Sequence, residues 1–333
     1  MPIGRIAYID AMRGTTMILV VYSHLCGFCL GDWAMAGNGV LMLFRLPCFF
    51  FVSGWLFGRM GPLWERKMIR TTVRHKFMVQ IVPTFIFLLL LAPPPEFFMR
   101  LGAMKGGYWF TFVLFEFFII CMLSERLFKR RTAVFALVLS LAAFLYDAHY
   151  NIFFFRRETL RQVLGFLSFS PWRFYVFFYF GVVVRRHFGF FLSLMERPYA
   201  LPLVTSIFAV IALLPHVESP YLSFIVFLLS GTSGVVMVFV FFRRFSSFIV
   251  RIPGLTFCGT RTLDIYLLHY FFLPRFLVTY TEYLLSVTPF HSLVILMLSI
   301  IIVTLCLATS GLLRLSPFLA HYLFGAKSSA SKN

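Results

Sequence analysis

The stretch from Ile9 to His24, IDAMRGTTMILVVYSH, places Asp10, Arg13 and His24 in a run that is otherwise apolar enough for a membrane. Residues eleven apart on an α-helix return to nearly the same face, so Arg13 and His24 line one stripe and Asp10 falls close to it. The rise from Arg13 to His24 is about 16 Å, roughly half the hydrocarbon thickness of a bilayer. We therefore expect a charged pair near one membrane surface and, at depth, an imidazole suited to acid–base or nucleophilic chemistry.

Each of these residues also has a structural explanation when it is taken alone. Arg13 can snorkel to the membrane surface and pair with Asp10, and His24 can be a hydrogen-bonded packing residue. Charges inside a bilayer are costly unless they are paired or hydrated, so the combination of the three favours function.

Further ionisable residues fall inside apolar runs: Arg45, Glu116, Asp264 and His269. Arg45 and Glu116 carry opposite charges and form one candidate pair. Arg261 and Asp264 form another, because residues three apart are neighbours on a helix. His269, one turn and more beyond Asp264, is equally compatible with packing and with lining a site.

Composition sets the class of protein. Hydrophobic residues make up 60% of the 333 residues and charged residues only 13%, against about 25% charged in a soluble domain. Apolar runs predict an all-α polytopic membrane protein, a bundle of about ten transmembrane helices. The candidate spans are residues 10–30, 39–58, 77–92, 108–123, 132–150, 172–187, 199–214, 221–242, 262–280 and 289–313. We expect one transmembrane domain over residues 1–313 and a short basic cytoplasmic tail over 314–333.

The distribution of charge predicts the topology. Lys and Arg favour alternate loops by about three to one, which places both termini in the cytoplasm. The net charge of +18 is scattered among these loops, so it indicates topology, with membrane lipids as neighbours, and no nucleic-acid partner. No cleavable signal peptide is evident, and the first span is expected to be retained. The six cysteines are spread along the chain, and no metal site is expected.

A basic stretch, RMGPLWERKMIRTTVRHKF, spaces Arg66, Arg70 and Arg74 at steps of four on one helical face. Such a row is typical of an interfacial amphipathic helix. It equally suits phosphate binding, because guanidinium groups present forked donors to phosphate oxygens. The two interpretations are compatible.

Five blocks of the sequence, taken in order, resemble the integral-membrane acyltransferase family 3. They are the Arg13-to-His24 block, LPCFFFVSGW after Arg45, YWF at 108–110, FYVFFYFG ending at Gly181, and GTRTLDIYLLH ending at His269. Arg45 is a departure, since many members have His before the Pro block. A second departure is that this sequence shows no appended extracytoplasmic esterase-like domain of the kind that some members carry.

The resemblance implies an acyltransferase of the O-acetyltransferase type, in a plasma membrane such as the bacterial inner membrane. It would move an acyl group, expected to be acetyl, from cytosolic acetyl-CoA to a hydroxyl of an extracytoplasmic or lipid-linked cell-surface glycan. His24, Arg13 and Asp10 would be catalytic, His24 as general base or as nucleophile. Arg13 with Arg66, Arg70 and Arg74 would bind the acyl-CoA donor.

Two other functions use similar features. One is a transporter or flippase of lipid-linked sugars, although the inverted repeats typical of many transporters are not apparent. The other is a membrane N-acetyltransferase that acts on an amino sugar.

An outer segment containing Arg156, Arg157 and Arg161 is a candidate contact for an anionic glycan. The sequence leaves the acceptor, the acyl chain and the oligomeric state open.

Overall fold

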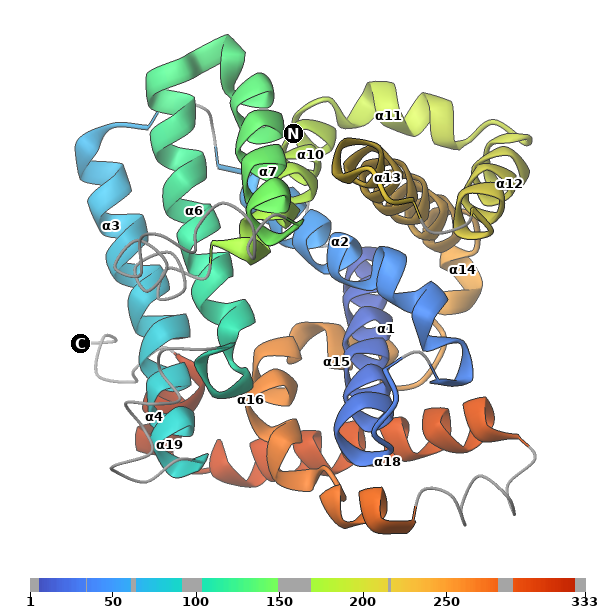
Figure 1. Ribbon diagram of the computed structural model, residues 1–333. Helices are drawn as coiled ribbons and strands as arrows, with labels where there is room; N and C mark the ends of the chain where they lie inside the picture. Colours follow the sequence, from blue (N-terminus) through green and yellow to red (C-terminus); the bar gives the residue numbers. More distant parts are fainter. Residues whose placement is uncertain are drawn as a thin grey trace, which may run out of the picture. The chain divides into compact units, whose positions relative to one another are not determined.

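The computed structural model describes residues 6–33, 35–60, 64–91, 104–148, 169–214, 217–280 and 290–326. Over these ranges the regular structure is entirely helical, which confirms the predicted all-α class (Figure 1). A helix pairs its own backbone polar groups, and this is what a chain so rich in apolar residues needs within a membrane. Residues 156, 157 and 161, proposed above to contact a glycan, lie outside the described ranges.

Four helices are long and apolar enough to cross a membrane: Met35–Phe57, Arg66–Leu91, Pro220–Arg244 and His291–Leu313. They contain α2 (Asn38–Phe57), α3 (Arg66–Lys76) with α4 (Val82–Leu91), α13 (Pro220–Arg244) and α18 (His291–Leu313). A fifth candidate span is a pair of helices, Ser170–Arg186 and Phe188–Met195, whose axes differ by 94°. The pair contains α10 (Tyr175–Arg186) and α11 (Phe188–Met195). Ten spans and cytoplasmic termini stay predictions.

The chain divides into two compact units. The first unit comprises residues 1–49, 192–214 and 229–315, and the second comprises 50–191, 215–228 and 316–333. Helices α2 and α13 each contribute to both units. The prediction of one domain over residues 1–313 stays a prediction.

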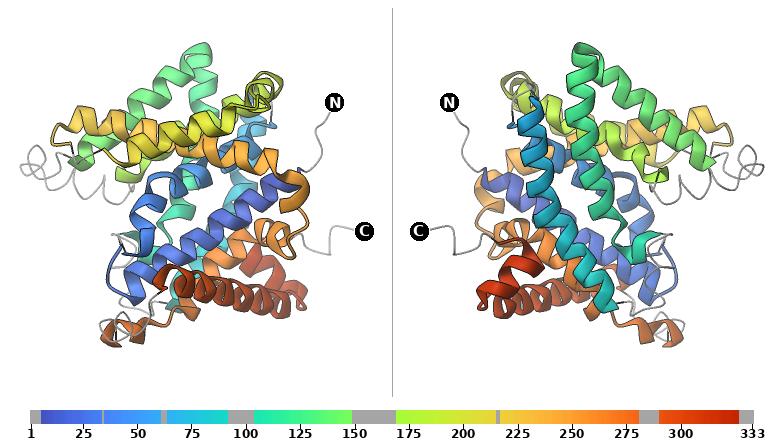
Figure 2. Two further views of the ribbon diagram at one scale, coloured as in Figure 1. Left: turned by 90° about the vertical axis from the view of Figure 1, so that its right-hand side faces the viewer. Right: turned by 90° about the vertical axis from the view of Figure 1, so that its left-hand side faces the viewer.

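The first unit is built around α1 (Ala7–His24), the predicted first span. Its neighbours are α15 (Leu255–Thr260), α16 (Thr262–Phe272) and α18, as Figure 1 and the left view of Figure 2 show. Glycine sets the closest approach: a methyl group at Gly259 would lie 1.7 Å from the Asp10 carbonyl oxygen. The backbones of α1 and α15 therefore touch directly, and the C-terminal helices are held against the stripe that carries Asp10, Arg13 and His24. The first unit also contains α12 (Ala200–Ala212) and α14 (Ser246–Ile249).

Helix α16 is tied to α18 by a buried ion pair. Asp264 is 3% exposed and accepts hydrogen bonds from Arg314 Nε and Nη2, both at 2.9 Å, and from the Ser310 hydroxyl. The pair of Asp264 with Arg261 that the sequence predicts is also present at 3.5 Å. The shorter contacts belong to Arg314, which the sequence interpretation had counted only as a cytoplasmic charge.

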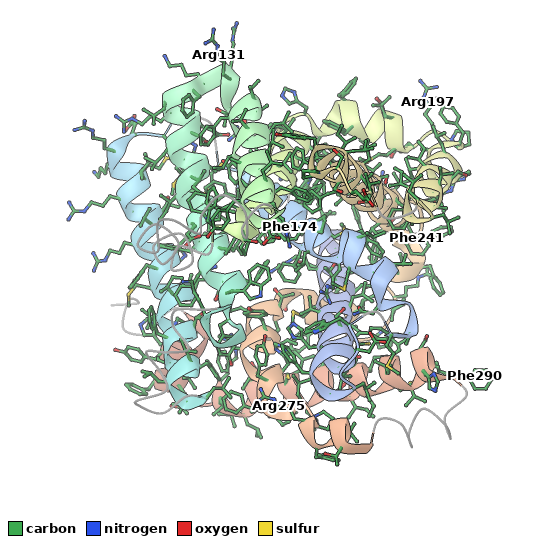
Figure 3. The ribbon with its side chains drawn as sticks, viewed as in Figure 1. Arg131, Phe174, Arg197, Phe241, Arg275 and Phe290 are labelled. Carbon is green, nitrogen blue, oxygen red and sulfur yellow. The ribbon has the colours of Figure 1, made fainter. Side chains whose placement is uncertain are left out.

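The second unit packs aromatic side chains and closely crossing helices. A methyl group at Gly54 of α2 would lie 1.8 Å from the Phe178 carbonyl oxygen of α10, so these backbones also touch. Phe50 and Phe174 stack with ring centroids 5.5 Å apart, and Phe174 points into the packed side chains in Figure 3. Helices α6 (Trp109–Phe128) and α7 (Thr132–Ala148) complete this core. Within the predicted tail, α19 (Pro317–Phe324) packs on α4.

Candidate active site

His24 is the last residue of α1 and is followed by a π-helical turn, Leu25–Cys29. Such turns are rare and frequently occur at functional sites. The imidazole is half-buried, whereas His269, on the last turns of α16, is fully buried. His24 Nδ1 lies 2.8 Å from His269 Nε2, so the structure joins two histidines that are 245 residues apart.

The hydrogen bonds of this pair assign the tautomers of both rings. His269 Nδ1 lies 2.7 Å from the carbonyl oxygen of Tyr266, which can only accept, so Nδ1 carries the hydrogen and Nε2 is the acceptor. His24 Nδ1 must then donate to His269 Nε2. This leaves a lone pair on Nε2 of His24, the atom that a base or a nucleophile needs.

Aromatic rings surround this pair. Tyr270 lies 5.4 Å from His24 and 4.1 Å from His269, measured between ring centroids. Phe28 and Trp33 lie 5.2 Å and 6.2 Å from His24 and are themselves about two-fifths exposed. An apolar wall of this kind limits water around the imidazole pair.

The predicted pairing of Asp10 and Arg13 is present. Arg13 Nη1 lies 3.6 Å from Asp10 Oδ1, and Arg13 Nη2 donates to Thr262 Oγ1 at 2.8 Å. The Thr262 hydroxyl of α16 therefore holds Arg13 in place. Arg13 and His24 are eleven positions apart on α1, a rise of about 16 Å, so the structure does not bring the two side chains together.

The second unit contains the predicted arginine row. Arg66, Arg70 and Arg74 lie along α3 and line an open pocket of about 740 Å³ together with Arg126 of α6. Their common face is the one that the spacing of four predicts. This arrangement is compatible with both the interfacial and the phosphate-binding interpretations.

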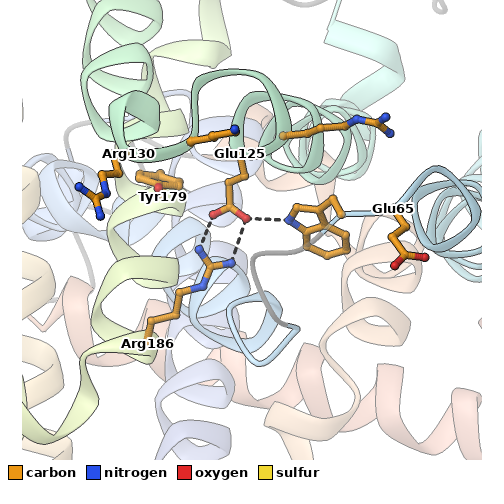
Figure 4. Close-up of a pocket in the computed structure, with 8 residues that line it drawn as sticks. Glu65, Glu125, Arg130, Tyr179 and Arg186 are labelled. Atoms are coloured by element: carbon orange, nitrogen blue, oxygen red, sulfur yellow. Dashed lines mark hydrogen bonds and ion pairs between the residues drawn. The ribbon is translucent and has the colours of Figure 1, made fainter.

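A second pocket of about 550 Å³ in this unit is lined by an ion pair between Glu125 and Arg186 (Figure 4). The buried Glu125 carboxylate accepts from Arg186 Nη2 at 2.9 Å and from Trp64 Nε1 at 2.7 Å. The sequence interpretation missed this network, although Glu125 ends an apolar run and Arg186 ends another. Exposed Arg126, Lys129 and Arg130 line the same pocket.

Two other sequence hypotheses have partial outcomes. Glu116 accepts a hydrogen bond from Trp172 Nε1 at 2.7 Å, a partner that the sequence did not indicate. Glu116 and Arg45 belong to different units, so their proposed pairing stays a prediction. Within the described ranges, no three His, Cys, Asp or Glu residues are grouped so that they could hold a metal ion.

Comparison with known proteins gives one match. A family model described as an acyltransferase domain matches residues 6–309, which include His24, His269 and the arginine row. No curated protein and no solved structure matches significantly. The matched region covers almost the whole chain, and its helices include several that are long and apolar enough to span a membrane. The chain therefore belongs to the acyltransferase-3 family of multi-pass membrane proteins.

Proposed function

We propose that this protein transfers an acetyl group from cytosolic acetyl-CoA to a hydroxyl of an extracytoplasmic or lipid-linked glycan, with His24 at the reaction centre. One observation carries the proposal: the hydrogen-bond chain from Tyr266 through His269 leaves Nε2 of the half-buried His24 as an acceptor. A fixed imidazole with a free lone pair is what proton removal from an alcohol requires. Family membership supplies the reaction class, acyl transfer.

As a general base, His24 Nε2 takes the proton from the acceptor hydroxyl while the hydroxyl oxygen bonds to the thioester carbonyl carbon. The carbon–sulfur bond then breaks, and the departing CoA thiolate takes the proton from Nε2. As a nucleophile, Nε2 would attack the thioester first and release CoA as the thiolate. The acceptor hydroxyl oxygen would then displace the acyl group from the ring, and the hydroxyl proton would pass to the thiolate. Both routes use the same nitrogen and give the same ester and free thiol.

Arg13 and the row of Arg66, Arg70 and Arg74 are our candidates for binding the donor phosphates. Forked guanidinium donors match phosphate oxygens well. Asp10 and Thr262 hold the Arg13 side chain, so its donors are positioned before a ligand arrives. The role of Arg13 fails if Arg13→Ala leaves both the affinity for acetyl-CoA and the turnover unchanged.

The test uses the full-length protein, purified in detergent, with radiolabelled acetyl-CoA and a lipid-linked glycan fraction. We expect free thiol to appear and label to enter the glycan fraction as an alkali-labile ester. An alkali-stable amide would instead indicate N-acetyl transfer. Movement of lipid-linked sugar across sealed vesicles without thioester consumption would replace the proposal with the transporter function.

His269 is expected to position His24 by accepting its Nδ1 hydrogen. His269→Ala should lower kcat about 10- to 100-fold with little change in the KM for acetyl-CoA, because partners of this kind set ring orientation and tautomer. His269→Gln should recover much of the loss, since its amide oxygen lies near the position of Nε2 and accepts the same hydrogen bond. Steady-state kinetics of the two variants measure this.

A purely structural role for His269 predicts a different pattern. In that case His269→Ala and His269→Gln would lose activity in step with their thermal stability, and glutamine would give no specific recovery. An unchanged kcat in a folded His269→Ala protein would also contradict the positioning role.

A further inference from the structure

Arg45 lies on the face of α2 that is turned toward the end of α1. The fully buried Asn38, the first residue of α2, shows which way this face points, because its side-chain oxygen accepts a hydrogen bond from the Ser23 hydroxyl of α1. Seven residues later the helix has made nearly two full turns, so Arg45 falls on the same face as Asn38, about 10 Å further along. Ser23 directly precedes His24, which places Arg45 on the side of the histidine pair.

Two nitrogens of the buried Arg45 guanidinium, Nε and Nη1, have no hydrogen-bond partner among the described residues. The residue is 6% exposed. A buried charged donor without an acceptor is strongly destabilising, and a charge in an apolar span is rare unless it has a function. These donors therefore point to an anionic oxygen that arrives with a ligand.

The residues around Arg45 indicate which oxygen atom of a ligand its donors would contact. The guanidinium is close enough for its charge to act on His24, Cys26 and Tyr270, so it belongs to the same cluster as the reactive imidazole. Attack on a thioester moves an electron pair from the C=O bond onto the carbonyl oxygen. That oxygen is one bond from the carbon that must lie beside His24 Nε2.

We propose that Arg45 donates hydrogen bonds to the thioester carbonyl oxygen of the donor and stabilises the negative charge that develops on it. This inference rests on the proposed function and adds a catalytic residue to it. It holds for both routes, because attack by the acceptor oxygen and attack by His24 each convert the C=O bond into a C–O⁻ group. When that group collapses, the electron pair re-forms C=O and CoA leaves as the thiolate. Preorganised donors in a site with little water are effective stabilisers of this charge.

The first experiment compares the binding of two unreactive donors to detergent-purified protein. Carboxymethyl-CoA carries a carboxylate close to where the thioester carbonyl would lie, and acetonyl-CoA carries a neutral ketone there. The wild-type protein should bind carboxymethyl-CoA more tightly by about tenfold or more, as a charge-assisted bond allows. Arg45→Met should remove this preference, whereas Arg244→Met, at an exposed arginine of α13, should keep it.

The second experiment follows thiol release from acetyl-CoA by the same proteins. Arg45→Met should lower kcat by about 100-fold, with KM for acetyl-CoA unchanged, because the interaction forms only as the charge develops. If Arg45→Met is not monodisperse, Arg45→Gln serves in both experiments. Equal binding of the two analogues by the wild type, or a preference that survives loss of Arg45, would overturn the inference while acetyl-CoA turnover still upheld the function.

Other outcomes also decide the question. A rise only in the KM for acetyl-CoA, or only in that for the acceptor, would show that Arg45 binds a substrate in its ground state, and the inference would be wrong. If the wild type neither binds CoA derivatives nor releases thiol from acetyl-CoA, the proposed donor is wrong and the inference fails with it.

Discussion

Replacing His24 by alanine is expected to lower the rate of thioester consumption by about 100- to 10,000-fold, the range that general-base catalysis contributes. The change removes the only atom to which both proposed routes assign the proton or the acyl group. Thiol release and equilibrium binding of acetyl-CoA, measured on the same preparation, test this expectation.

The matched control is His187→Ala, which removes an exposed histidine at the end of α10. We expect this variant to keep wild-type turnover, and His24→Ala to keep acetyl-CoA affinity within about threefold, since a reacting group is not required for ground-state binding. His24→Ala with normal turnover would remove His24 from the mechanism. Trapping of an acyl-His24 species under single-turnover conditions distinguishes the routes, because only the nucleophilic route forms an acyl-histidine.

The sequence predicted well those features that depend on neighbouring residues or on average composition. The helical class follows from long apolar runs, which have to satisfy their own backbone polar groups. The Asp10–Arg13 pair and the shared face of Arg66, Arg70 and Arg74 follow from helical geometry. Each of these predictions is decided within one helix, so the rest of the fold has little influence on it.

Contacts between distant segments were beyond this reasoning. His24 and His269 were each picked out, yet periodicity carries no information about which helices of a bundle are adjacent. The direct contact of helix α1 with helix α15 depends on Gly14 and Gly259, where the two backbones approach too closely for a side chain. The partner of Asp264 was assigned to Arg261 by spacing, and the structure adds Arg314, which lies 50 residues away. Long-range pairs of this kind require the packing itself.

Asp264→Ala is expected to have the largest effect on stability, a loss of about 3–5 kcal/mol, because it leaves the Arg314 charge without its partner in a largely buried place. The carboxylate is 3% exposed and receives both Nε and Nη2 of Arg314. It also accepts from the Ser310 hydroxyl, so three donors lose their acceptor at once. Thermal or SDS-induced unfolding in a defined detergent measures the change.

Two further variants separate loss of the pair from loss of packing. Asp264→Leu combined with Arg314→Met should recover much of the stability, because removing both charges leaves neither one buried alone. Glu196→Ala disrupts the exposed pair of Glu196 with Arg243 in the same unit and should cost at most about 1 kcal/mol. If Asp264→Ala were no more destabilising than Glu196→Ala, the ion pair would not be what holds α16 against α18. Because α16 also carries His269, that result would require another explanation for the fixed position of the histidine pair.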